Sequence, residues 1–200
     1  MAKRQQEEVI SIITFDIETS NLSADFGRVL CAVVKQVGKK PIIFRGDNYA
    51  AWKKGNKYDD SMLVLDIIEE LNKHDVLIAH NGMKFDRPFL NTRAYSGLSG
   101  GTGGLIVNPR SKMIDPVLIA RKHLRFSYNS LARILQHFGL GSKSSVEGHM
   151  WLRALLATGK EQRQAMDEVV EHCIVDVVKL EQLVGKLRKF IPRIDEYGSK

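Results

Sequence analysis

The sequence has few of the features that mark secreted, cysteine-ligated or membrane-spanning proteins. Only two of its 200 residues are cysteines, Cys31 and Cys173, and both lie in apolar runs far apart in the chain. Two such residues argue against a disulfide scaffold and against a zinc site built from cysteines, which fits a reducing cytoplasm. No apolar run reaches the roughly 18–20 residues that cross a bilayer, and the polar residues 1–8 lack the apolar stretch of a secretory signal. We therefore expect a cytoplasmic protein with no membrane partner.

Composition and charge indicate a basic globular domain. Hydrophobic residues make up 44% of the chain and charged residues 26%, which is ordinary for a protein that buries a core. The length predicts a single domain over residues 1–200, with residues 1–8 as a disordered tail and 192–200 as a frayed C-terminus. Thirty Lys and Arg against 23 Asp and Glu give a net charge of +7, which favours a polyanionic partner such as nucleic acid without proving one.

The order of the apolar segments predicts an α/β fold with a mixed sheet of about five strands flanked by helices. The first segment is β-branched and nearly continuously apolar, as a central strand is, and a turn at residues 38–40 makes the next two strands an antiparallel hairpin. A helix between the first and fourth strands makes those two parallel. The expected strands are Val9–Glu18, Val29–Val37, Pro41–Arg45, Asp75–His80 and Lys112–Ile114.

Helices are expected between and after the strands. Met62, Leu65, Ile68 and Leu71 recur three apart, which we interpret as the apolar face of the helix that contains them. Asp115-Pro116 is a good helix start, with Asp as N-cap and Pro at the first helical position. Besides the helix that starts at Asp115-Pro116, the expected helices are 59–71, which contains the four apolar residues above, and 85–95, 130–138, 147–157 and 161–190.

Three carboxylates follow the two parallel strands. Asp16 and Glu18 lie two residues apart at the end of the first strand, so both project from the same face. Asp86 lies just beyond the fourth strand, and parallel strands bring their carboxyl ends to one edge of the sheet. Taken singly, the Asp16–Glu18 pair could be a solvated strand end, and Asp86 could simply cap the helix that follows.

The last long helix carries a charge in an apolar row. Val169, Asp176, Leu183 and Phe190 recur every seven residues, and Asp176 is the one charged member of this row. A buried carboxylate must face a cation or hydrogen-bond donors to keep its charge. His172 lies one turn earlier on the same side; a lone histidine there is normally structural, but its position beside Asp176 favours a functional role. Oxygen ligands of this kind suit Mg²⁺ or Mn²⁺, and two such ions can cleave a phosphodiester bond.

Three short motifs resemble those of a known superfamily of nucleases. Phe15–Thr19, Asn81–Asp86 and His172–Asp176 are similar to the three exonuclease motifs of the DEDD superfamily, which comprises 3′→5′ exonucleases on a ribonuclease-H-like fold. Each motif alone is weak, but three in this order, with the expected elements between them, are a strong signal. The resemblance spans about Ile12 to Leu183. It is greatest to the stand-alone exonucleases related to the proofreading domain of family-B polymerases.

The resemblance implies a ribonuclease-H-like fold and a role for each acid. Asp16, Glu18, Asp86 and Asp176 would hold two Mg²⁺ or Mn²⁺ ions, with Asp16 bridging them. His172 would orient or deprotonate the attacking water. Three residues separate it from the last acid, Asp176, as three follow the tyrosine in the tyrosine subgroup, whereas the histidine subgroup usually has four residues between histidine and acid. An imidazole titrates near 6.5 and could accept a proton at neutral pH.

The implied activity is hydrolysis of single-stranded nucleic-acid 3′ ends, with release of nucleoside 5′-monophosphates. DNA is favoured over RNA as the substrate, although no contact to a 2′-hydroxyl can be read from the sequence. A polymerase or replication protein would act with it in trans. Basic and aromatic residues around the motifs are candidates to contact the strand, and the glycine-rich loop 96–104 is either a flap over it or a plain linker. The candidate substrate contacts are Ile17, Thr19, Asn81, Lys84, Phe85, Arg87, Arg110 and Lys143.

Two other functions remain open from the sequence. The first is a catalytically silent nucleic-acid-binding or polymerase-accessory module on the same fold, although the presence of all four acids argues against it. The second is a phosphatase of the haloacid-dehalogenase type, because residues 16–19 loosely resemble its Asp-x-Asp-x-Thr loop. The phosphatase alternative leaves His172 and Asp176 unexplained.

Overall fold

The computed structural model describes residues 10–96, 104–141 and 147–191. Five strands form one sheet in the order β3-β2-β1-β4-β5. The β1–β2 and β2–β3 pairs are antiparallel, whereas β1–β4 and β4–β5 are parallel. This confirms the α/β fold class and the mixed sheet that the sequence predicts. The strands are β1 (Ile12–Thr19), β2 (Val29–Gln36), β3 (Ile42–Arg45), β4 (Val76–Ile78) and β5 (Lys112–Ile114).

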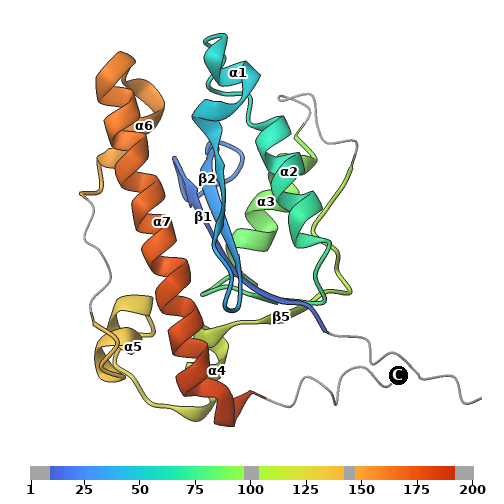
Figure 1. Ribbon diagram of the computed structural model, residues 1–200, viewed down its shortest axis with the longest axis vertical. Coiled ribbons are helices and arrows are strands. Elements are labelled where there is room, and N and C mark those ends of the chain that lie inside the picture. Colours follow the sequence, from blue (N-terminus) through green and yellow to red (C-terminus); the bar gives the residue numbers. More distant parts are fainter. Residues whose placement is uncertain (1–9, 97–103, 142–146, 192–200) are drawn as a thin grey trace, which may run out of the picture.

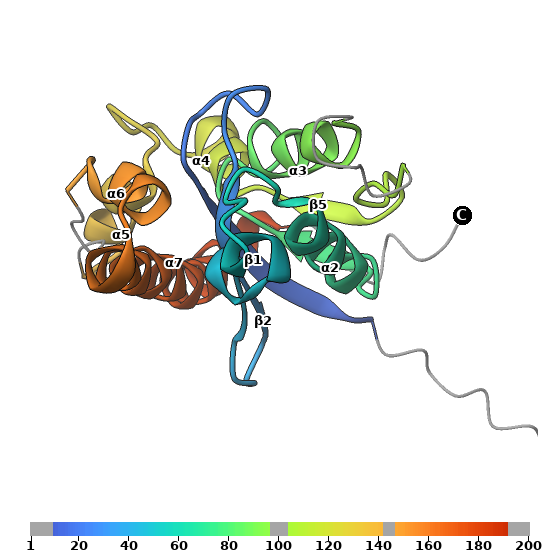
Figure 2. The same ribbon diagram turned by 90° about the horizontal axis from the view of Figure 1, so that it is seen from above.

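Helices cover both faces of the sheet. Figures 1 and 2 show α2 and α3 on one face, and α7 on the other with α6 packed against it. The short η1 and α1 after β3 are not expected from the sequence, because four residues are too few to show a helical period. The helical elements are η1 (Gly46–Asn48), α1 (Ala50–Lys53), α2 (Ser61–Leu71), α3 (Asp86–Ala94), α4 (Pro116–His123), α5 (Leu131–His137), α6 (Met150–Leu156), α7 (Gly159–Leu187) and η3 (Arg188–Phe190).

The alternation of side chains along β1 decides what each face of the sheet presents. Ile13, Phe15 and Ile17 are at most 4% exposed and belong to the core beneath α2 and α3. Asp16 and Glu18 point the other way, toward α7. The central strand therefore has one wholly apolar face and one face that ends in two carboxylates.

The core face of α2 differs from the one expected. Met62 is 56% exposed, and α2 packs through Leu63, Val64, Ile67, Ile68 and Leu71. Each step of three residues falls about 60° short of a full helical turn. A set spaced three apart therefore drifts from the buried side at Leu71 to solvent at Met62.

The long helix α7 buries three members of the row that the sequence predicts, including the charged one, and Phe190 lies beyond it in η3. Val169, Leu183 and Asp176 are all buried, and so is His172. In the part of the chain that the structure describes, no helix combines the length and apolarity needed to cross a membrane. The expected tails at 1–8 and 192–200, most of the 96–104 loop, and Lys143 lie outside the described residues.

Candidate active site

Asp16 and Glu18 lie on the face of the sheet that packs against the middle of α7. The Cys173 thiol lies 3.4 Å from the Asp16 carbonyl oxygen and 3.6 Å from Asp16 Oδ2. Burial in the first place, then a hydrogen bond with Cys31, raises the pKa of the Cys173 thiol well above its usual value. Cys173 is therefore a neutral thiol that donates to Asp16.

His172 lies between two acids. Its Nε2 is 3.7 Å from Glu18 Oε1 and 3.7 Å from Asp176 Oδ2. The side chains of His172 and Asp176 are each 4% exposed, and that of Glu18 is 12% exposed. Because the helix places His172 one turn before Asp176, the same ring reaches both carboxylates.

Asp86 lies against the backbone of β1, at the residue between Asp16 and Glu18. It is the first residue of α3 and is 2% exposed, and its Oδ1 accepts a hydrogen bond from the Ile17 backbone N–H at 3.3 Å. Phe85 occupies the N-cap position, so Asp86 is not the cap that one alternative assumed. Burial, and after it the negative charge of Asp16, raises the pKa of Asp86 well above its usual value. The bonds from backbone N–H groups only partly offset this.

A tight turn delivers Asp86 to the site. Asn81 has a φ of 66°, in the left-handed region that glycine favours and that asparagine also adopts. Asp115 holds this turn, because its carboxylate accepts from the Asn81 N–H at 3.0 Å and from the Met83 N–H at 3.3 Å. The same Asp115 caps α4 through the Val117 N–H, as the sequence predicts. Asp115 thus links the end of β5 to the segment that carries Asp86.

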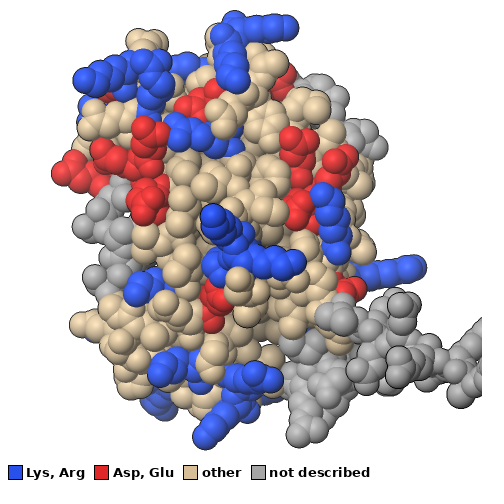
Figure 3. All heavy atoms as spheres, viewed as in Figure 1, with Lys and Arg blue, Asp and Glu red and all other residues tan. Residues whose placement is uncertain are grey.

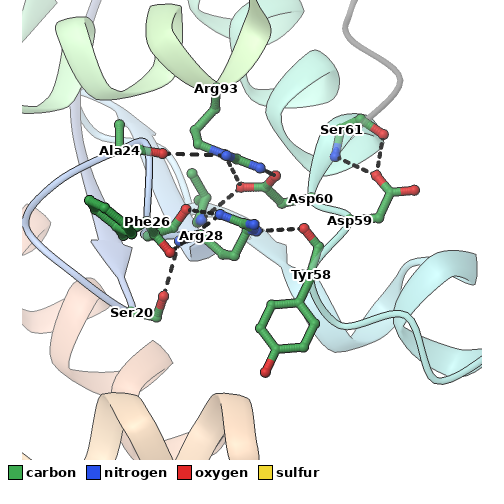
Figure 4. A network of polar contacts seen from close by, with 11 residues as sticks. Ser20, Ala24, Phe26, Arg28, Tyr58, Asp59, Asp60, Ser61 and Arg93 are labelled. Atoms are coloured by element: carbon green, nitrogen blue, oxygen red, sulfur yellow. Dashed lines mark hydrogen bonds and ion pairs between the residues drawn. The ribbon is translucent and has the colours of Figure 1, made fainter. Parts of the chain in front are cut away.

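Another network holds the loop that follows Glu18 and Thr19. Figure 4 shows Arg93 of α3 reaching Asp60, and also the Ala24 carbonyl oxygen at 3.3 Å. Arg93 and Asp60 are almost wholly buried, with side chains 1% and 3% exposed. Arg28 closes the other end of the loop through the Ser20 hydroxyl and the Tyr58 carbonyl. The loop beside the candidate site is therefore anchored to α2 and α3.

The donor groups fit hard divalent cations. Two sets of three residues each offer ligand atoms that lie within 4.8 Å of one another inside the set. The first set is Asp16, Glu18 and Cys173, and the second is Glu18, His172 and Asp176. Carboxylate oxygens predominate, and such oxygens suit Mg²⁺ or Mn²⁺. Burial and the negative charge of Asp16 raise the pKa of Asp86 above its usual value, and a cation bound beside this carboxyl would favour its charged form.

The predicted substrate contacts separate into two groups, and those of the first group lie within a few residues of Glu18 or Asp86 in the chain. Lys84 is exposed, and Arg87 is partly so. Phe85 is half-buried against the core, with its ring 5.5 Å from that of Phe89. Thr19 donates its hydroxyl to the Asn21 carbonyl, and Asn81 serves the turn described above.

The other predicted contacts are remote or buried. Ile17 is 4% exposed with its side chain in the core, so that side chain offers no surface to a strand. Arg110 is exposed but immediately precedes β5, at the amino edge of the parallel strands, whereas the acids lie at the carboxyl edge. The expectation that Arg110 lies around the motifs was therefore wrong. Figure 3 shows Lys and Arg spread over the top, middle and bottom of the face that it presents, interspersed with Asp and Glu.

Trp151 is a site residue that the sequence does not reveal. It lies on α6, and its indole Nε1 donates to Glu18 Oε2 at 2.6 Å. Its ring also meets the His172 ring edge-on, with centroids 5.5 Å apart. The predicted helix over 147–157 places Trp151 on an amphipathic element, but no local pattern identifies a partner 133 residues away.

Comparison with known proteins identifies the superfamily of the chain and a solved structure with a similar fold. Residues 13–188 match the RNase H superfamily, and the chain belongs to that superfamily. No curated protein matches the sequence. The fold is similar to part of the family-B DNA polymerase from the hyperthermophilic archaeon Pyrobaculum calidifontis, with a TM-score of 0.58 and 18% identity. The likeness covers 88% of this chain and 25% of the polymerase, so the chain corresponds in length to about a quarter of that enzyme.

Proposed function

We propose that the chain is a metal-dependent 3′→5′ exonuclease of the DEDD type that acts on single-stranded nucleic-acid ends. The observation that carries this proposal is that Glu18 and Asp176 meet at His172, while Asp16 lies beside Glu18 and Asp86 accepts from the Ile17 N–H between those two acids. Membership of the RNase H superfamily and the likeness to a polymerase fold support it. Residues 1–200 would form one exonuclease domain. The superfamily membership gives no support to the phosphatase alternative.

Asp16, Glu18, Asp86 and Asp176 would hold the cations. Two divalent ions in such a site lower the pKa of a water and stabilise the charge that develops on the leaving oxygen. The protein supplies a rigid frame for them, because Asp86 is tied to the Ile17 N–H and Asp16 to the Cys173 thiol. Burial of Asp86 and Asp176 keeps bulk water away and strengthens electrostatic interactions at the site.

His172 would accept the proton of the attacking water. Its Nε2 faces two carboxylates at 3.7 Å, and these carboxylates stabilise the imidazolium that proton uptake would produce. His172→Ala should then lower turnover by about 10²–10⁴-fold, the usual contribution of a general base. Near-normal turnover in His172→Ala, beside an inactive Asp176→Ala, would make the histidine architectural only.

The decisive assay digests matched, end-labelled DNA and RNA single strands with Mg²⁺, with Mn²⁺ and with a chelator. We expect stepwise shortening from the 3′ end, release of nucleoside 5′-monophosphates, faster loss of DNA than of RNA, and no reaction with chelator or with Asp16→Asn. Tight binding of the strands without shortening, in both metals, would instead favour the catalytically silent binding module. Trapping a polymerase or replication protein on the chain would support action in trans.

A further inference from the structure

Trp151 holds one oxygen of Glu18 while the other oxygen faces the site. The indole N–H of Trp151 donates to Glu18 Oε2 at 2.6 Å, and Glu18 Oε1 lies 3.7 Å from His172 Nε2. The two carboxylate oxygens therefore have different neighbours on opposite sides. A glutamate side chain has several rotatable bonds, and these contacts restrict it to one orientation.

The chemistry of the indole suits this task. An indole N–H is a donor only and carries no charge. It can orient a carboxylate without neutralising it, whereas a lysine or arginine at the same place would compete with a cation. The edge-on contact between the Trp151 and His172 rings, with an interplanar angle of 88°, makes one side chain a neighbour of both Glu18 and His172.

The position of Trp151 is set by the packing of α6. Its neighbours in that helix, Met150 and Ala154, are buried in the core that α6 shares with α7 and β2. Trp151 itself is partly buried against the same core. Because α6 is fixed to α7 in this way (Figures 1 and 2), the indole N–H is presented to Glu18 before any cation arrives.

We propose that Trp151 is a positioning residue that preorganises Glu18 for divalent cations. The inference rests on the cation site of the proposed function, but it concerns binding rather than cleavage. Partners that orient a metal ligand usually change metal affinity or activity by about 10–100-fold when they are removed. We expect a loss in that range for Trp151→Phe, which keeps an aromatic ring and removes the N–H.

The test measures Mn²⁺ binding to the full chain by calorimetry, beside exonuclease activity. The matched control is Trp52→Phe, because Trp52 is the other of the two tryptophans and its ring contacts Lys57 instead. Trp52→Phe should bind Mn²⁺ as the unaltered chain does. In Trp52→Phe the sole tryptophan is Trp151, and Mn²⁺ should quench its fluorescence. In Trp151→Phe the sole tryptophan is Trp52, and Mn²⁺ should quench its fluorescence much less.

A second variant distinguishes two causes of a lower Mn²⁺ affinity, the loss of the indole N–H and altered packing of the ring. Benzothienylalanine at position 151 replaces the N–H with sulfur in a ring of nearly the same shape, so it should lose Mn²⁺ affinity as Trp151→Phe does. Unaltered affinity in this variant, or in a folded Trp151→Phe, would overturn the inference, as would a wild-type chain that binds no Mn²⁺. A chain that binds Mn²⁺ in a Trp151-dependent way but cleaves no strand would contradict the exonuclease proposal and leave this inference standing.

Discussion

The buried ion pair between Arg93 and Asp60 gives the sharpest stability prediction. The Arg93 guanidinium contacts the Asp60 carboxylate at 2.6, 3.1 and 3.2 Å, and both side chains are at most 3% exposed. Replacing Arg93 with methionine keeps much of the aliphatic stem and removes the charge. The Asp60 carboxylate then stays buried, with the Val29 N–H at 2.9 Å still donating to it.

The cost follows from that uncompensated charge. Breaking a buried pair by removal of one partner destabilises a protein by about 3–5 kcal/mol. For a chain of this length, 1 kcal/mol corresponds to about 2–4 °C in Tm. We therefore expect Arg93→Met to lower Tm by about 6–20 °C. Arg163→Met, an exposed position on α7, should change stability by less than about 0.5 kcal/mol.

Urea unfolding followed by circular dichroism measures this effect. Adding Asp60→Asn to Arg93→Met should recover part of the loss, because the amide oxygen still accepts from the Val29 N–H and no charge remains buried. A loss below about 1 kcal/mol in Arg93→Met, or a double variant less stable than the single one, would refute the reasoning.

Three further predictions concern the segment that carries Asp86. Asp86→Asn should abolish cleavage yet raise Tm in chelator at neutral pH. The pKa of Asp86 is raised in the folded state, so its ionisation lowers stability as pH rises from the ordinary pKa near 3.9 through the folded-state pKa. A series of Tm measurements against pH should show this fall in the wild type and not in Asp86→Asn. Asp115→Ala removes the cap of α4 and two hydrogen bonds to the Asn81 turn, so the free energy of unfolding in urea should fall by about 2–4 kcal/mol and activity should fall as well. Unchanged activity would show that Asp115 does not position Asp86. Gly82→Ala places a Cβ 2.3 Å from the Ala79 Cβ and should cost about 1–3 kcal/mol, so a variant as stable as the wild type would contradict the packing described.

Most of the fold can be predicted from the sequence because its signals are local. The β-branched run of β1, the turn around Gly38 and the Asp115-Pro116 helix start each act within a few residues, and the structure has each of them. The core face of α2 was missed because a spacing of three is not the helical period. The apolar row of α7 was found because a spacing of seven residues is close to two helical turns.

The contacts that organise the site are long-range, and no pattern in the sequence contains them. Arg93 looks like a surface charge on a short helix, and only the fold places it against Asp60, 33 residues away. Asp115 was recognised as a cap, but not as the acceptor for the Asn81 turn. Arg110 was misplaced because the segment before a strand lies at the opposite edge of a sheet from the segment after it.

A crystal of the chain soaked in MnCl₂ tests the central claim most directly. Anomalous scattering at the manganese edge should give two peaks among the carboxylates of Asp16, Glu18, Asp86 and Asp176, and Asp16→Asn crystals should lose them. Soaked crystals with ordered side chains and no anomalous peak among these four acids would contradict the account.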